Sequence, residues 1–384
     1  MIKELERRVF RRSLEDTRFF RRFARRTAYL LARGDPEAVH ELALRELNRF
    51  EDVVAEVAPK FDFPDLHVGI NGRSVMPFGT AAGLDKNGDA LCPLSHLFGF
   101  LEPGTVVVQR REGNERPRVA VDDANGEIYN AQGFPNKGLY NFLRNAASYR
   151  ERGGEAPLLI SICGIPPEIG RFEMAYRELE ELLDRLCPYA DGFVWNPFSP
   201  NTVALTALRT PEEFRRSADT IAEKAEGKLK LVKMGPYDRD GRQQWLDLVD
   251  AWIEGGGDGI VAVNTYMVPR EKIPARNWGY PSAGRSGPFL KEYRQLAVRD
   301  CRGAFPDSFI IATGGIDSGE EAWHALQAGA DALEGYTPYT FHGFGLLPEM
   351  ASFVQSSLRA LGYAALSQFQ NDIRRNAMSC AYTG

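Results

Sequence analysis

Eight short apolar segments recur along the chain, each followed by a polar or glycine-rich loop and then a helical stretch. They lie at residues 78–82, 105–108, 158–163, 192–195, 229–234, 259–263, 309–313 and 332–336. Their apolar residues do not alternate with polar ones, which is typical of strands buried on both faces. Because strands that alternate with helices form parallel sheets, and eight close a barrel, we predict a (β/α)8 TIM barrel. An open doubly wound sheet is the alternative, but no GxGxxG motif follows the first segment.

A small helical unit at residues 1–60 is predicted to precede the barrel domain at residues 61–384. Residues 1–34 carry ten arginines and one lysine against four acidic residues, with apolar residues spaced for one face of a helix. This profile is typical of a helix lying on an anionic membrane surface. A second helix is expected from Asp35 and Pro36 to near Pro59. The pair Asn71 and Gly72 predicts a hairpin within residues 66–76.

Bulk composition excludes several classes of function. The 384 residues carry a net charge of -5, which gives no support for nucleic-acid binding. The five cysteines form no CxxC pair and the five histidines no paired-ligand spacing, so neither a metal site nor a disulfide framework is expected. The sequence contains no run of 18 consecutive apolar residues, so it predicts no membrane-spanning helix. We expect peripheral association with the cytoplasmic face of a membrane, and the acidic residues of the basic segment favour a bacterial inner membrane over a mitochondrial one.

The chemistry is expected in the loops that follow the strands, as in other such barrels. The fourth apolar segment stops at Asn196, and Ser199, Asn201 and Thr202 follow within the same loop. Carboxamides beside one hydroxyl suit a flat, hydrogen-bonding substrate that loses a proton, because amides bind the polar edges of such a ring. A simple turn after the strand is the alternative interpretation.

Two lysines and a set of glycines add to this prediction. Lys233 lies within an apolar segment and needs an anionic or strongly polar partner, whereas Lys86 could equally lie in a solvated turn. Gly314 and Gly315 follow the seventh segment, and Tyr336 and Thr337 follow the eighth. Free backbone amides at this place in a barrel predict a phosphate-binding site.

With its loops assembled, the chain resembles the dihydroorotate dehydrogenase family, and most closely the membrane-associated class 2 branch. The similar segments are AAGLDKNG at 81–88, GTV at 104–106, GN at 113–114, PR at 117–118, Asn130 with GF at 133–134, Asn196 with SPNT at 199–202, NT at 264–265, SG at 286–287 and GGID at 314–317. The similarity extends from about residue 35 to about residue 350.

The resemblance implies FMN-dependent oxidation of (S)-dihydroorotate to orotate in pyrimidine biosynthesis, with a membrane quinone as electron acceptor. It implies that Ser199 is the base for the C5 proton. The implied substrate-binding residues are Lys86, Asn130, Phe134, Asn196, Asn201, Asn264 and Thr265. The implied cofactor-binding residues are Ala82, Gly83, Lys86, Thr105, Ser161, Lys233, Thr265, Ser286, Gly287, Gly314, Gly315, Tyr336 and Thr337. The segment at 35–41 resembles the branch's N-terminal helices, which form an apolar entry for the membrane quinone.

Several residues differ from the family's pattern, among them Phe198, Ala131, Gln132 and Pro135. These differences lie in the flavin-contacting set and at the rim of the predicted site. A flavin oxidoreductase of the same fold that acts on another cyclic amide is therefore the alternative function.

Overall fold

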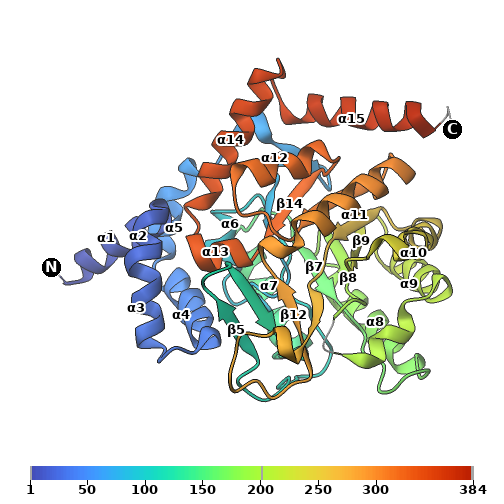
Figure 1. Cartoon of the computed structure of the whole chain (residues 1–384), viewed down its shortest axis with the longest axis horizontal. Helices are drawn as coiled ribbons and strands as arrows, with labels where there is room; N and C mark the ends of the chain where they lie inside the picture. Colours follow the sequence, from blue (N-terminus) through green and yellow to red (C-terminus); the bar gives the residue numbers. More distant parts are fainter. Residues whose placement is uncertain (1, 200–201, 382–384) are drawn as a thin grey trace.

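The computed structural model describes residues 2–199 and 202–381, and it confirms the (β/α)8 barrel (Figure 1). The barrel strands are β3 (Phe78–Thr80), β4 (Phe100–Leu101), β7 (Leu159–Ile162), β8 (Gly192–Trp195), β9 (Leu229–Met234), β10 (Gly259–Ala262), β13 (Phe309–Thr313) and β14 (Ala332–Gly335). They form one eight-stranded parallel sheet in the order β4-β3-β14-β13-β10-β9-β8-β7. A parallel bridge between Leu101 and Leu158 joins the two ends of this order, so the sheet closes on itself.

The second barrel strand differs from the prediction. It is Phe100–Leu101, whereas residues 105–108 contribute only a bridge between Val106 and Ile162. Pro103 and Gly104 separate the two segments, and Gly104 has a φ of 120°. Because that conformation takes the chain out of the sheet, Thr105 is carried beyond the end of the barrel toward the predicted site.

Helices surround the barrel on its outer side (Figure 1). They are α6 (Leu91–Ser95), α7 (Leu139–Glu151), α8 (Glu173–Leu186), α9 (Pro211–Lys224), α10 (Arg242–Glu254), α11 (Lys291–Ala304), α12 (Gly319–Gln327), α13 (Thr337–His342) and α14 (Leu346–Ala360), followed by α15 (Leu366–Ala381). Helix α8 shows why they form, since Leu179, Leu182, Leu183 and Leu186 recur at helical spacing and are all buried. Among the described residues, no helix is both long and apolar enough to cross a bilayer.

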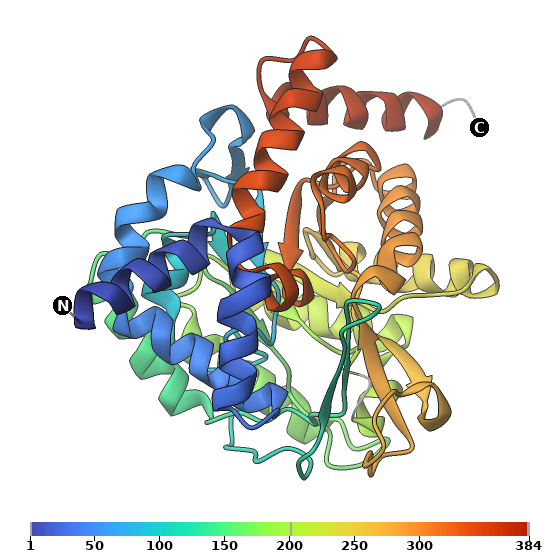
Figure 2. The same ribbon diagram turned by 60° about the vertical axis from the view of Figure 1, so that its left-hand side comes forward.

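The N-terminal residues form several helices that pack against one side of the barrel (Figure 2). They are α1 (Ile2–Glu15), α2 (Thr17–Phe19), a π-helical turn at Phe20–Ala24, α3 (Arg25–Leu31), α4 (Pro36–Arg49) and α5 (Glu51–Val57). The single basic helix that the sequence predicted is broken at Asp16, whose extended backbone and carboxylate cap the next helix through the amide of Phe19 at 2.8 Å. The second predicted helix is likewise divided, at Phe50.

Two small antiparallel sheets lie outside the barrel. Strands β1 (Val68–Ile70) and β2 (Arg73–Val75) confirm the predicted hairpin, with Asn71 and Gly72 both at positive φ. The second sheet has the order β11-β12-β6-β5, from β5 (Val119–Asp122), β6 (Glu127–Asn130), β11 (Tyr266–Pro269) and β12 (Ser282–Ser286), and it was not predicted. It combines loops from distant parts of the chain around a separate apolar cluster that includes Tyr129, Val268 and Trp278.

A substitution of Gly259, at the start of β10, tests how tightly the barrel strands pack. A Cβ atom there would lie 1.9 Å from the backbone oxygen of Phe309 on β13, which cannot move without breaking the sheet. We expect Gly259→Ala to lower the free energy of unfolding by roughly 1–3 kcal/mol or more. Gly303→Ala is the control, because a Cβ atom at this position in α11 meets nothing within 4 Å, and it should raise stability by up to about 1 kcal/mol. If the two variants unfold at the same urea concentration, the backbone of β13 does not lie as close to Gly259 as the structure indicates.

Candidate active site

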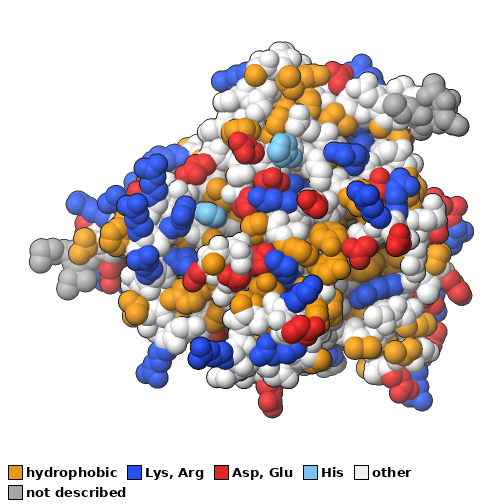
Figure 3. Space-filling view, in the orientation of Figure 1, with side chains coloured by type: hydrophobic (Ala, Val, Ile, Leu, Met, Phe, Trp, Pro, Cys, Tyr) orange, Lys and Arg blue, Asp and Glu red, His pale blue; other side chains and the backbone are white. Residues whose placement is uncertain are grey.

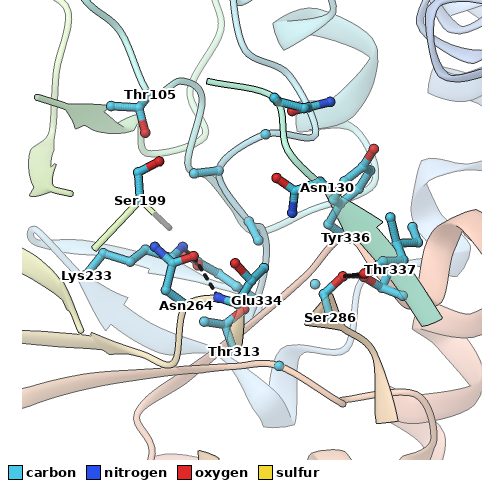
Figure 4. A pocket seen from close by; sticks show the side chains of 18 of the residues that line it. Thr105, Asn130, Ser199, Lys233, Asn264, Ser286, Thr313, Glu334, Tyr336 and Thr337 are labelled. Carbon is cyan, nitrogen blue, oxygen red and sulfur yellow. Dashed lines mark hydrogen bonds and ion pairs between the residues drawn. The ribbon is translucent and has the colours of Figure 1, made fainter. Parts of the chain in front are cut away.

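A cavity opens at the carboxyl ends of the barrel strands and brings together most of the predicted site residues (Figure 4). Those that line it are Ala82, Gly83, Lys86, Thr105, Asn130, Phe134, Asn196, Ser199, Lys233, Asn264, Thr265, Ser286, Gly287, Gly314, Gly315, Tyr336 and Thr337. Asn201 lies outside the described residues. Ser161 does not line the cavity; it is fully buried behind Thr105, with 3.0 Å between the two hydroxyl oxygens.

Carboxamides from two strand ends form a continuous chain of hydrogen bonds. The Asn264 amide nitrogen donates to the Asn196 oxygen at 3.1 Å, and the Asn196 nitrogen donates to the Thr105 hydroxyl at 2.9 Å. The Asn264 oxygen accepts from the amide of Thr265 at 2.7 Å. Because each side chain fixes the next, these polar groups are held in one orientation before a ligand binds.

The loop that carries Ser199 is held by an arginine that the sequence analysis missed. The Arg209 guanidinium donates to the backbone oxygens of Pro197 at 3.1 Å and Ser199 at 3.3 Å. It also lies 4.7 Å from the centre of the Phe198 ring, and burial lowers the pKa of Arg209 to about 10. Phe198, one of the residues that differ from the family pattern, therefore anchors this loop.

The loop after β3 positions Lys86. The buried Asp85 carboxylate accepts from the amides of Asp89 and Ala90, each at 2.8 Å, and burial raises the pKa of Asp85 to about 6. The Lys86 ammonium donates to the Gly83 oxygen at 3.1 Å, while burial lowers its pKa. Lys86 therefore lies in a structured loop at the cavity and not in a solvated turn.

Lys233 finds the anionic partners that its apolar strand required. Its ammonium lies 2.6 Å from a Glu102 oxygen and 3.2 Å from a Glu334 oxygen. Burial acts to lower the pKa of Lys233, but the two negative charges outweigh it and raise that pKa. The sequence analysis missed both glutamates, although Glu334 gives the same signal as Lys233, a charged residue inside an apolar strand.

At the predicted phosphate site, Gly287, Gly314 and Gly315 all have a positive φ, a backbone conformation that favours glycine. A Cβ atom at Gly315 would lie 2.7 Å from Lys291 Cγ, and one at Gly287 would lie 2.6 Å from the Gly126 oxygen. Ser286 and Thr337 hydroxyls lie 2.9 Å apart at the edge of this backbone (Figure 4). The buried Thr265 hydroxyl has no hydrogen-bond partner among the described residues. The glycine backbone, the paired hydroxyls of Ser286 and Thr337 and the unpartnered Thr265 hydroxyl together fit a phosphate-bearing cofactor.

A second, apolar cavity of about 480 Å³ lies between the N-terminal helices and the barrel. Phe10, Phe20, Leu31 and Leu44 are among the residues that line it. The two cavities share Val119, Ile128 and Tyr336 in their linings, so these side chains form part of a wall between them. His40 reaches the same wall, with its ring 5.6 Å from that of Tyr336.

Fold and cavity define a (β/α)8-barrel enzyme whose active site lies at the carboxyl ends of the strands. The family model described as dihydroorotate dehydrogenase matches residues 67–358. The dihydroorotate dehydrogenase (quinone) of Delftia acidovorans is 32% identical over 336 residues, covering 83% of this chain and 93% of the relative. That of Ralstonia nicotianae is 33% identical over 339 residues, covering 84% and 95%.

A solved structure agrees with these relatives. Dihydroorotate dehydrogenase from Eimeria tenella in complex with ferulenol has a TM-score of 0.75 and 25% identity, over 87% of this chain and 94% of that one. The chain therefore belongs to the dihydroorotate dehydrogenase family, in its quinone-dependent class 2 branch, a family of flavoenzymes.

His40 provides a test of the environment at the wall between the cavities. Burial, followed by the positive charge of Lys86, lowers the pKa of His40 to about 3. Below pH 6.5 the unfolded chain protonates this histidine while the folded protein does not, so His40 should make stability fall as the pH falls. The contribution is at most about 1.4 kcal/mol per pH unit. Urea unfolding at pH 7 and pH 5 should show a smaller loss for His40→Gln than for the natural protein.

The exposed His324 provides the control for this experiment. We expect His324→Gln to retain the pH dependence of the natural protein. If His40→Gln and His324→Gln lose the same stability between pH 7 and pH 5, His40 is not held neutral in the folded state.

Proposed function

We propose that this protein oxidises (S)-dihydroorotate to orotate, with FMN as its cofactor and a membrane quinone as electron acceptor. The relatives named dihydroorotate dehydrogenase (quinone) support the two substrates. The observation that carries the proposal is the wall shared by the two cavities, made of Val119, Ile128 and Tyr336. A polar cavity for the cofactor and substrate thus adjoins an apolar cavity that suits a quinone.

When bound, FMN would accept a hydride from the substrate and pass the electrons on to the quinone. The residues that would hold its phosphate are Ser286, Gly287, Gly314, Gly315 and Thr337, because their hydroxyls and glycine backbone line the same cavity. One such phosphate site is proposed, and the sequence lacks a dinucleotide motif, which favours FMN over FAD.

The carboxamides of Asn130, Asn196 and Asn264 would bind the edges of the pyrimidine ring, and Lys86 would lie near its carboxylate. The amides of Asn196 and Asn264 are already oriented by hydrogen bonds, so little order is lost when the substrate binds. Asn201 is assigned the same role from the family resemblance alone.

Ser199 would take the proton from C5 of the substrate. A serine hydroxyl is a weak base at neutral pH, so it must pass this proton on through a neighbour such as Thr202 or through water. Arg209 would keep the hydroxyl in place by holding the backbone oxygens on either side of Phe198. Ser199 is thus the proposed catalytic residue and Arg209 a positioning residue.

The N-terminal helices would bind the cytoplasmic face of a membrane, with a bacterial inner membrane favoured. The arginines of α1 are partly neutralised, since Arg7 and Arg11 pair with Glu56 on α5. The exposed Arg21, Arg22 and Arg26 form no ion pair among the described residues, and basic side chains gather over these helices in Figure 3. The strongly exposed apolar residues beside them are Phe23, Leu30 and Leu31. Leu5 and Val9 on α1 are exposed as well, but the unpaired arginines make residues 17–31 the part of this unit that we propose contacts the membrane most.

Ser199→Ala tests the proposed chemistry. The purified natural protein should be yellow, release FMN on denaturation, and reduce a soluble quinone with dihydroorotate. In Ser199→Ala the flavin should stay bound, while stopped-flow reduction by dihydroorotate slows by roughly 10²–10⁴, the usual contribution of positioned acid-base catalysis.

Ser217→Ala is the matched control, because this buried serine contacts Tyr176 far from the cavity and should leave the rate unchanged. A loss of less than about threefold in Ser199→Ala would place the base elsewhere. A yellow protein that dihydroorotate does not reduce would support the alternative of another cyclic amide substrate.

Charge reversal on α3 and the turn before it tests membrane binding. We expect Arg21→Glu, Arg22→Glu and Arg26→Glu together to abolish sedimentation with anionic phosphatidylglycerol vesicles and to raise the KM for long-chain quinones. Each basic residue near an anionic surface contributes about 1 kcal/mol, and this attraction is screened by salt. Reduction of FMN by dihydroorotate in a single turnover should not change, since these arginines are remote from the active-site cavity.

The control variant reverses three exposed arginines on another part of the surface, Arg177→Glu, Arg185→Glu and Arg239→Glu. It makes the same change in net charge but should retain vesicle binding. Equal sedimentation of the two triple variants would show that residues 17–31 are not the membrane-binding surface.

A further inference from the structure

Three charged side chains meet at one side of the active-site cavity, and their formal charges do not balance. Lys233 on β9 contacts Glu102, just after β4, and Glu334 on β14. Their side chains are 5%, 0% and 0% exposed, respectively. If all three were ionised, this almost fully buried cluster would hold a net charge of -1, which is strongly unfavourable.

Among the described residues around the cluster, no other charge compensates for this excess. At the neighbouring positions of the adjacent strands lie Val261 on β10, Thr313 on β13 and Gly79 on β3, none of which is charged. The nearby Tyr339 on α13 is neutral, because burial raises the pKa of its phenol. Within the described part of the chain, Lys233 is thus the cation available to the two carboxyls.

The hydrogen bonds of the cluster indicate that the two carboxyls bind a proton. Each glutamate directs one oxygen to Lys233, whereas the second oxygen of Glu102 and that of Glu334 have no hydrogen-bond partner among the described residues. Burial raises the pKa of Glu334 well above its usual value, and the charge of Glu102 raises it further, against the opposing effect of Lys233. Two adjacent carboxyls that share one proton form a hydrogen bond with each other and leave a single negative charge.

We propose that the Glu102 and Glu334 carboxyls hold one proton between them at neutral pH, so that their cluster with Lys233 is electrically neutral. Glu334 lines the cavity and Glu102 does not, so Glu334 is the member whose protonation acts on a bound cofactor. Its role in reduction rests on the proposed function. A neutral cluster does not oppose the negative charge that a hydride brings into the cavity, whereas a cluster with charge -1 would oppose it.

Infrared spectroscopy tests the shared proton without turnover or substrate. At pH 8, where Asp85 with its pKa of about 6 is ionised, the natural protein should show a protonated-carboxyl absorption band that shifts when glutamate is labelled with ¹³C. The band should be lost in both Glu334→Gln and Glu102→Gln. It should persist in Glu213→Gln, which changes another buried glutamate, one that is bonded to Tyr176 outside the cavity.

Absence of the band from the natural protein overturns the proposal, and this result does not depend on whether either variant folds. Persistence of the band in both Glu334→Gln and Glu102→Gln also overturns it, because the proton would then be elsewhere. Neither measurement requires dihydroorotate or quinone, so failure of the proposed function would be seen separately in the turnover assay.

The reduction potential of bound FMN gives a second readout. If Glu334 is already protonated, glutamine only replaces one neutral group by another, and the equilibrium constant for flavin reduction at pH 7 should change by less than about threefold. If both glutamates are ionised, Glu334→Gln removes a negative charge beside the cavity and should favour reduction by more than about tenfold. The second result would contradict a neutral cluster.

Discussion

The closed ring of parallel strands is the constraint on which the active site depends. Because all eight strands run in the same direction, their carboxyl ends meet at one end of the barrel, whatever the distance along the chain. Asn196 follows β8 and Asn264 follows β10, yet their amides are hydrogen bonded. The bridge between Leu101 and Leu158 completes the ring and thereby fixes where Lys86, after β3, lies relative to both. A break in the ring would separate groups that can act only together.

Barrel closure also requires that charged residues inside the strands are paired with one another. Interior side chains of a barrel have no water around them, so Lys233 must be paired from within, by Glu102 and Glu334 on other strands or their ends. A single such residue in a sequence is easy to recognise. Its partners are harder to find, because they lie 131 and 101 residues away and nothing local in the sequence marks the pairing.

Seven of the barrel strands and the hairpin at Asn71 could be predicted because local patterns determine them, namely continuous apolar segments and a turn signal. The second strand could not be placed, since the two residues Phe100–Leu101 form too short an apolar segment to stand out from the one after Gly104. In the β11-β12-β6-β5 sheet, β12 and β6 pair across more than 150 residues, which no local pattern reveals, whereas β5 with β6 and β11 with β12 are local antiparallel pairs whose turns were not recognised from the sequence. Asp16 caps the helix that follows it and so ends α1. This break was not predicted, because the apolar residues on both sides of Asp16 keep the same helical spacing.

The unpredicted sheet has consequences for the proposed function. Strand β5 contributes Val119 and strand β6 contributes Ile128 to the wall between the two cavities, and Asn130 at the end of β6 lines the polar one. In the proposed function, one hairpin would therefore take part both in substrate binding and in separation of the two cavities. A wall of apolar side chains keeps a charged substrate out of the apolar cavity, because transfer of a carboxylate there is costly. In the proposed function the electrons would cross this shared wall, so the cofactor and the quinone would not need to occupy one solvent space.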